Sequence, residues 1–173
     1  MIDQVSTAPK VDLRAYRPNV QDSRLRWWWR YYASCLCVDN DLAHGDIIEV
    51  VAPATLPDHG FIPAVAVMGS PSTFSERLPS GEELRNAVMA VLAARHVGSN
   101  NYDDSDLTAV MNLEIGGSNG MRGFQMAVWT CKPLVDADLM GRAYPNLRQV
   151  TPNNAGIALV PAAAADGKGN TVV

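Results

Sequence analysis

The stretch LTAVMNLEIGGSNGMRGFQMAVWTC, Leu107–Cys131, decides the predicted fold. Apolar and polar residues alternate over Leu107–Ile115, and a second run with apolar residues at every other position covers Phe124–Cys131. Alternation of this kind is typical of a half-buried antiparallel sheet, because successive side chains in a strand point to opposite faces. The glycine-rich Gly116–Gly120 between the two runs is typical of a hairpin connection. The stretch therefore predicts two antiparallel strands joined by a flexible loop.

A helix is predicted before this stretch, over about residues 81–96. Ser80 and Glu83 have the spacing of a capping box, in which each side chain accepts a hydrogen bond from a free backbone N–H of the first turn. One apolar stripe follows at helical spacing, formed by Leu84, Val88, Val91 and Leu92. Arg95 and His96 lie near the predicted end, where positive charge is favoured, and Gly98 has the position of a left-handed C-cap.

The remaining strand candidates are Asp46–Val51, Phe61–Met68 and the short Ile157–Val160. Pro63 places the start of the second run at an edge or a bulge, since proline cannot donate to a sheet ladder. The predicted fold class is β-rich α+β: an antiparallel sandwich or barrel-like core with one packed helix and extended termini. We expect an N-terminal arm over residues 1–24, a core domain over 25–135 and an extended tail over 136–173, with residues 166–173 loose.

The charge of the chain is unevenly distributed. The net charge is −4, but residues 1–32 hold six of the 14 basic residues and only three acidic ones, so that this region is net +3. The acidic remainder argues against wholesale binding to nucleic acid or to an anionic membrane. No run approaches the roughly 18 apolar residues that span a bilayer, and no secretory signal opens the chain, so we expect synthesis in the cytoplasm.

An aromatic and basic segment follows the predicted arm. Its residues are Arg24, Arg26, Trp27, Trp28, Trp29, Arg30, Tyr31 and Tyr32. Three interpretations remain open: a protein–protein hot spot, because Trp, Tyr and Arg dominate such sites; ordinary core packing of the rings; and single-stranded nucleic-acid binding, which requires stacking rings and Arg.

Catalytic and metal-binding patterns are weak. Cys35, Cys37 and Cys131 do not form the two pairs of a structural zinc site, and their odd number favours reduced thiols. The histidines (His44, His59 and His96) have no local nucleophile partner, and no phosphate-binding loop pattern occurs. Two acidic groups, Asp103-Asp104-x-Asp106 and Asp136-x-Asp138, are interpreted as solvated loop carboxylates. We expect no enzyme activity, no metal site and no cofactor.

The segment from Leu42 to Ile62 contains two short motifs, L-x-x-G-D-x-I at Leu42–Ile48 and L-P-x-x-G at Leu56–Gly60. It resembles a recurring pattern in small virion proteins of tailed bacteriophages, although Asp58-His59 lengthens the second motif by one residue. The resemblance implies a β-sandwich capsid decoration, or cement, protein. Its partners would be the major capsid protein or other virion subunits, and it would form a homo-oligomer, with a trimer favoured.

The predicted function is accordingly that of a structural virion component that ties neighbouring capsid subunits together, without contact to a membrane. Extended termini suit this role, because they wrap large surfaces with little core of their own. The alternative is a single-stranded nucleic-acid-binding module that uses residues 24–32.

Overall fold

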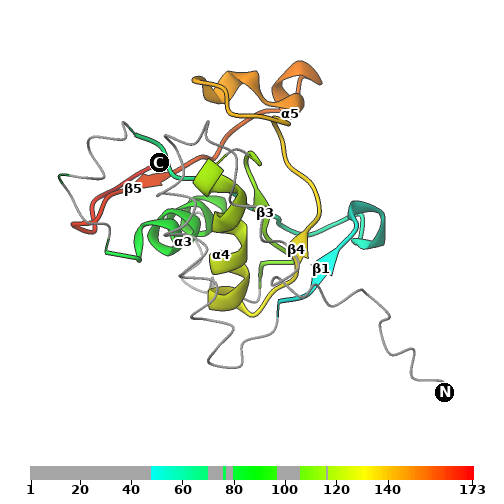
Figure 1. The fold of residues 1–173 in the computed structure, drawn as a ribbon, viewed down its shortest axis with the longest axis horizontal. Helices are drawn as coiled ribbons and strands as arrows, with labels where there is room; N and C mark the ends of the chain where they lie inside the picture. The colour runs from blue at the N-terminus through cyan, green and yellow to red at the C-terminus, as the bar shows by residue number, and fades with distance from the viewer. Residues whose placement is uncertain (1–47, 70–75, 77–79, 97–105, 116) are drawn as a thin grey trace, which may run out of the picture.

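A computed structural model of the chain describes residues 48–69, 76, 80–96, 106–115 and 117–173 (Figure 1). Four short strands form its centre: β1 (Val50–Val51), β2 (Ala64–Val65), β3 (Met111–Asn112) and β4 (Leu134–Val135). Strand β1 pairs with β4 and β2 with β3, in both cases parallel. A parallel bridge from Val110 to Leu134 joins the two pairs in the order β2-β3-β4-β1.

Parallel pairing corrects the predicted antiparallel hairpin. The first predicted strand, Leu107–Ile115, is confirmed only in part: within it, Met111–Asn112 form β3, and Leu107 and Val110 make isolated parallel bridges. The second is wrong: residues 117–121 form the 3-10 helix η4 (Gly117–Met121), and α4 (Arg122–Thr130) follows directly. Helix α4 thus carries the chain from β3 back to the parallel neighbour β4. Parallel strands need a crossover of this kind, whereas a hairpin serves only antiparallel ones.

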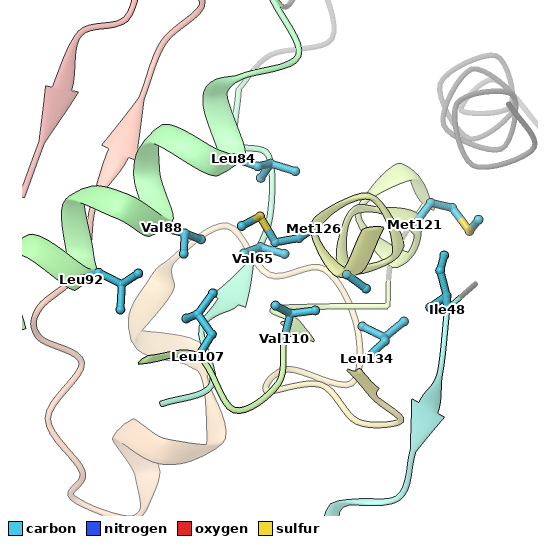
Figure 2. Close-up of a cluster of buried hydrophobic side chains, with 11 residues drawn as sticks. Ile48, Val65, Leu84, Val88, Leu92, Leu107, Val110, Met121, Met126 and Leu134 are labelled. Atoms are coloured by element: carbon cyan, nitrogen blue, oxygen red, sulfur yellow. The ribbon is translucent and has the colours of Figure 1, made fainter. Parts of the chain in front are cut away.

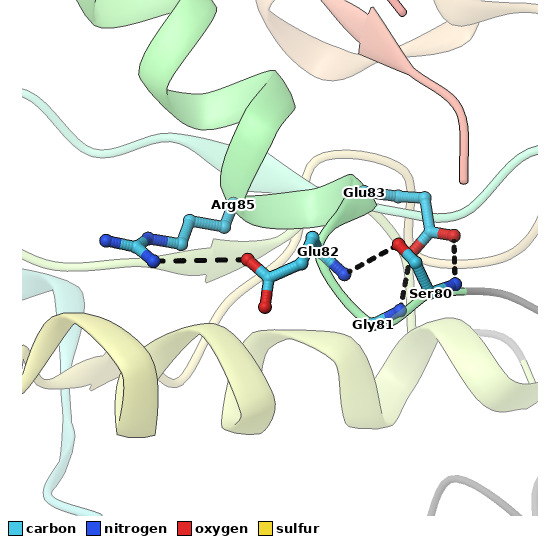
Figure 3. A network of polar contacts seen from close by, with 5 residues as sticks. All are labelled: Ser80, Gly81, Glu82, Glu83 and Arg85. Carbon is cyan, nitrogen blue, oxygen red and sulfur yellow. Dashed lines mark hydrogen bonds and ion pairs between the residues drawn. The ribbon is translucent and has the colours of Figure 1, made fainter. Parts of the chain in front are cut away.

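Helix α3 (Glu83–Arg95) confirms the predicted helix. The Glu83 carboxylate accepts hydrogen bonds from the backbone N–H groups of Ser80 (2.7 Å) and Gly81 (2.9 Å), and the Ser80 hydroxyl accepts one from Glu82 N–H (3.2 Å) (Figure 3). Partial burial acts to raise the pKa of Glu83, but these N–H donors outweigh it and hold the pKa below its usual value. The predicted C-cap at Gly98 lies outside the described residues.

The core lies between the two helices and the parallel strands. Figure 2 shows Val88 and Leu92 of α3 and Met126 of α4 beside Leu107 and Val110. Other members of the cluster are Ile48, Val65, Leu84, Met121, Ala127 and Leu134. Ala109 and Val110 are consecutive and both fully buried, which is typical of a parallel strand covered on both faces.

Residues after β4 return to the core twice. Val150 is fully buried between η5 (Leu147–Gln149) and α5 (Thr151–Asn154), and the N–H of Thr151 donates to the Leu139 carbonyl (2.8 Å). The chain then forms an antiparallel hairpin, β5 (Ala164–Ala165) with β6 (Thr171–Val172), that packs against α3 (Figure 1). Residues 166–173 are therefore part of a hairpin, and the predicted strand at Ile157–Val160 is not formed.

The fold is a small α+β arrangement with short strands, and the described residues form neither a closed barrel nor a β-sandwich. The predicted strands at Asp46–Val51 and Phe61–Met68 contain β1 and β2, respectively. A 3-10 helix, η2 (Pro53–Thr55), lies between them. The expected N-terminal arm, residues 1–24, is outside the described part. No helix in the described ranges is long and apolar enough to cross a membrane.

Candidate binding site at the carboxyl edge of the parallel strands

The carboxyl ends of β2, β3 and β4 lie at one edge of the parallel strands, because the three strands run in the same direction. The residues that follow them are Val67 after β2, Glu114 after β3 and Asp138 after β4. In open parallel sheets with helical crossovers, ligands commonly bind at this edge. We refer to Val67, Glu114, Asn119 and Asp138 as the edge site.

Glu114 is the buried charged side chain of this site, with only 8% of its surface exposed. Its Oε1 accepts a hydrogen bond from Asn119 Nδ2 at 2.6 Å. Its Oε2 is also buried but makes no hydrogen bond in the described structure. A buried carboxylate normally has its oxygens paired, because the loss of water is otherwise uncompensated. Half of the Glu114 carboxylate is therefore left without a partner.

Asn119 fixes the glycine-rich turn against the end of β2. Its Oδ1 accepts a hydrogen bond from Val67 N–H (2.9 Å), and its Nδ2 donates to the Val67 carbonyl (3.1 Å) as well as to Glu114. The side-chain amide thus pairs with Val67 as a neighbouring strand would. Because Asn119 belongs to η4, this pairing holds the start of the helical segment beside the Glu114 carboxylate.

A second asparagine fixes the same turn from β3. The Oδ1 of Asn112 accepts a hydrogen bond from Gly123 N–H (2.7 Å), and its Nδ2 donates to the Gly120 carbonyl (3.2 Å). A Cβ atom at Gly123 would lie 2.6 Å from Leu134 Cδ1 and 2.7 Å from Asn112 Oδ1. Glycine is therefore required there for the first turn of α4 to approach the strands, and the position of the edge site depends on this approach.

Asp138 ties the loop after β4 to the loop after β3. Its Oδ2 accepts hydrogen bonds from the backbone N–H groups of Ile115 (3.1 Å) and Gly141 (2.8 Å). Ile115 itself is 55% exposed, and Met68, which follows Val67, is 73% exposed. The edge site therefore combines a buried carboxylate with exposed apolar side chains at the residues adjoining Val67 and Glu114.

A hollow of about 510 Å³, separate from the edge site, lies between α3 and the β5–β6 hairpin. Its lining includes the small side chains of Ala90, Ala93 and Ala94, and Asn86 and Thr171 are its polar side chains. None of its lining residues has a titratable side chain. Ligand sites usually place a few polar groups at the centre of an apolar lining, so the edge site is the stronger candidate.

Most residues singled out from the sequence are not part of the edge site. The segment with Arg24, Arg26, Trp27–Trp29, Arg30, Tyr31 and Tyr32 lies outside the described residues, as do Cys35, Cys37 and His44. Cys131 is exposed. His96 pairs with Asp106 (Nε2 to Oδ2, 3.3 Å) before the start of β3, at the opposite, amino-terminal edge. Within the described ranges, no three His, Cys, Asp or Glu residues cluster as a metal site would require.

Asp138 was among the sequence candidates, but as a solvated carboxylate, whereas the structure gives it two backbone donors. Glu114 and Asn119 were missed. The alternating pattern placed Glu114 on a solvent face, and the glycines around Asn119 indicated a hairpin. The available signal was the spacing Gly117-x-x-Gly120-x-x-Gly123 directly after a strand, which suits a close strand-to-helix turn.

Comparisons with known proteins identify the family. The family model described as "S-Me-THD-like, N-terminal domain" matches residues 30–173, and the chain belongs to this family. A crystal structure of a protein from Chromobacterium violaceum is similar, with a TM-score of 0.59 and 26% sequence identity over 78% of this chain. The match covers 36% of that protein, so the chain spans about a third of its length. No curated protein sequence matches.

These findings correct the resemblance to tailed-phage virion proteins. The family and the bacterial structure carry no virion or capsid connection, so the interpretation as a bacteriophage decoration or cement protein is wrong. The two motifs behind it are short turn-and-strand patterns. The second contains Gly60 with a positive φ of 122°, a conformation that favours glycine in any family. Self-association and single-stranded nucleic-acid binding remain predictions.

Proposed function

We propose that this member of the S-Me-THD-like family is a ligand-binding domain, and that the edge site receives a small molecule through Glu114. The observation that carries the proposal is the buried Oε2 of Glu114, which has no hydrogen-bond partner in the described structure. An unpaired buried polar group costs about 1–3 kcal/mol, and more when it is charged. A group of that cost is retained where it serves a function, and a bound ligand would supply the absent partner.

The surrounding geometry supports the same role. Asn119 orients the carboxylate through Oε1, so that Oε2 is the oxygen left for a ligand. Asn119 is in turn held by both backbone groups of Val67, and Asn112 holds the turn from the other side. A site supported in this way needs little rearrangement of its carboxylate on binding, which lowers the entropic cost of association.

The test compares the full 173-residue chain with its Glu114→Gln variant in a thermal-shift screen of small cations, amides, carboxylates and divalent metal ions. Ligand binding at Glu114 predicts that at least one class raises the melting temperature of the wild-type chain and not that of the variant. Glu82→Gln is the matched control, because Glu82 is an exposed glutamate whose ion pair with Arg85 is long, at 3.9 Å. Equal responses of the wild type and Glu114→Gln to every class would reject the proposal.

A docking role is the second candidate, and exposed apolar side chains near the C-terminus favour it. Ile157 is 61% exposed, Val160 78%, Val172 71% and Val173 64%. A contiguous patch of such side chains would mark an interaction surface. Measurement of the molar mass by light scattering tests this candidate. Docking between copies predicts that the wild-type chain self-associates and that the double variant Val160→Ser/Val172→Ser does not. A wild-type chain that is a monomer at every concentration would argue against docking.

A further inference from the structure

The glycine-rich turn between β3 and α4 contains the dipeptide Asn119-Gly120, the one Asn-Gly pair in the sequence. An asparagine that precedes a glycine is the kind that loses its side-chain amide most readily. The backbone nitrogen of the glycine attacks the asparagine Cγ, and glycine has no Cβ to hinder this approach. The sequence therefore places its most reactive asparagine at the centre of the hydrogen bonds that hold this turn.

Deamidation changes two bonds at Asn119 and then consumes one water molecule. A bond forms between the Gly120 nitrogen and Asn119 Cγ, and the bond from Cγ to Nδ2 breaks. The side-chain nitrogen leaves as ammonia, with the proton of the Gly120 N–H. Water then opens the five-membered imide ring at one of its two carbonyl carbons. The product at position 119 is aspartate or its β-linked isomer, in which the main chain runs through the former side chain.

The folded turn opposes this reaction in two ways. Ring closure brings Asn119 Cγ and the Gly120 nitrogen into one plane with the Asn119 main chain, whereas Asn119 lies in η4, and a 3-10 helix has a ψ of about −20 to −30° that does not allow this. The side-chain amide is also held by three hydrogen bonds, two to Val67 and one to Glu114. Three bonds of ordinary strength favour the hydrogen-bonded turn by roughly a hundredfold.

The product does not fit the same turn. Asn119 Nδ2 donates to Glu114 Oε1 at 2.6 Å and to the Val67 carbonyl at 3.1 Å. Aspartate has a second carboxylate oxygen where asparagine has Nδ2, and an oxygen without a proton cannot donate. Both hydrogen bonds are therefore lost, and two carboxylates face each other across a distance that suited a donor and an acceptor. The β-linked isomer also adds one carbon atom to the main chain of η4.

We propose that Asn119-Gly120 is a self-deamidation site that reacts when the turn opens, and that its product detaches the turn from Val67 and Glu114. The release of ammonia makes the change irreversible, so the fraction of modified chains grows with the age of the protein. The hydrogen bonds of Asn119 set the rate of this ageing, because they determine how often the turn opens. This inference goes beyond the proposed function and does not depend on a ligand of Glu114.

The experiment follows deamidation of the full chain at mildly alkaline pH, with fragment-ion mass spectrometry to assign the modified residue. In urea that unfolds the chain, Asn119 should react before every other asparagine, and the folded chain should react there about 100-fold more slowly. Glu114→Ala removes one of the three hydrogen bonds and should speed the reaction of the folded chain about 10-fold. Glu82→Ala, which removes an exposed glutamate of another segment, should leave the rate unchanged.

Gly120→Ala is the matched variant for the chemistry. Gly120 does not have a positive φ, and an added Cβ would lie no closer than 3.5 Å to Ile115 atoms, an ordinary contact, so the variant should keep the fold. Its Cβ hinders attack by the nitrogen of residue 120, so Asn119 should react severalfold more slowly in urea. Asn119→Asp reproduces one product and should destabilise the chain more than Asn119→Ala does, because it adds a charged acceptor beside Glu114.

Each part of the proposal has an outcome that overturns it. Earlier reaction of another asparagine in urea would mean that Asn119-Gly120 is not the site. Equal rates at Asn119 in the folded chain and in urea would mean that its hydrogen bonds do not protect it. An Asn119→Asp chain as stable as the wild type would mean that the product does not detach the turn. If Glu114→Ala does not fold, the wild-type rates with and without urea and the Gly120→Ala rate still decide.

Discussion

Replacement of Glu114 by glutamine should stabilise the isolated domain, although the residue is buried and hydrogen-bonded. Glutamine keeps an oxygen that can accept from Asn119 Nδ2, now 2.6 Å from Glu114 Oε1, and removes the charge. The bond to Asn119 becomes neutral, which loses about 1 kcal/mol. The charge removed from Oε2 was buried without a partner, and its desolvation costs about 2–3 kcal/mol. The amide NH2 that replaces Oε2 is itself buried without a partner, which offsets part of the gain. The expected net gain is therefore about 1 kcal/mol.

Urea unfolding of the wild-type and variant chains, followed by circular dichroism, measures this difference. A gain of about 1 kcal/mol corresponds to a rise of roughly 2–4 °C in the melting temperature of a chain of this length. Asn119→Ala is the contrasting variant: it loses three hydrogen bonds, two to Val67 and one to Glu114, and should destabilise the chain by about 3 kcal/mol. A loss of 2 kcal/mol or more in Glu114→Gln would refute the reasoning, because it would mean that both carboxylate oxygens are paired in the folded chain.

Three further predictions concern the fold itself. Gly60→Ala should destabilise the chain by more than about 2 kcal/mol in urea unfolding, because Gly60 has a φ of 122° and the added Cβ would overlap Thr108 Oγ1. Gly141→Ala is the control: Gly141 has a φ of 71°, but an added Cβ would meet no heavy atom within 4 Å, so this substitution should cost only about 1 kcal/mol. The pKa of Glu83 is lowered in the folded state, so the stability that this carboxylate contributes is present above its ordinary pKa and is lost as the pH falls through the lowered folded value. Unfolding curves from pH 6 to 3 should therefore show the stabilities of the wild type and Glu83→Gln converging in acid. A stability difference that stays constant over this range would contradict the prediction. Leu92→Ala should cost about 2–5 kcal/mol by thermal unfolding, since Leu92 is fully buried in the core, and a loss under 1 kcal/mol would contradict the packing described.

The sequence predicted α3 well because its signals are local. Ser80 and Glu83 fix its start through hydrogen bonds within four residues, and its buried side chains (Leu84, Val88 and Leu92) recur at helical spacing. Strands β1, β2 and β3 were also located, since each lies in an apolar run bounded by turn residues. What these runs do not contain is the direction of pairing, which depends on the segments between them.

Helix α4 was missed because its buried face is made of small and polar residues. Gly123, Met126, Ala127 and Thr130 are buried at positions i, i+3, i+4 and i+7, the spacing of a helix. Three of the four are not large apolar residues, so the stripe is inconspicuous in the sequence. The larger Phe124 and Val128 are only partly buried and, together with Met126, produce the alternation of a strand. Because α4 packs closely on β3 and β4, its buried face requires small residues, and this packing stabilises the segment as a helix.

The edge site could not be found without the direction of the strands. In an antiparallel hairpin, Glu114 would point to solvent and Asn119 would occupy an exposed turn. In the parallel arrangement, the same two residues meet beside Val67, which is about 50 positions away in the sequence. The hydrogen bonds of Asn119 to Val67 have a separation of 52 residues, and no local pattern predicts such a contact.

A crystal structure of the full chain with a ligand class that raises its melting temperature tests the central claim most directly. We predict a donor group of that ligand about 2.7–2.9 Å from Glu114 Oε2, the usual length of a charge-assisted hydrogen bond. A Glu114 carboxylate whose Oε2 is bonded to a side chain of the protein itself, with the ligand elsewhere or absent, would contradict it.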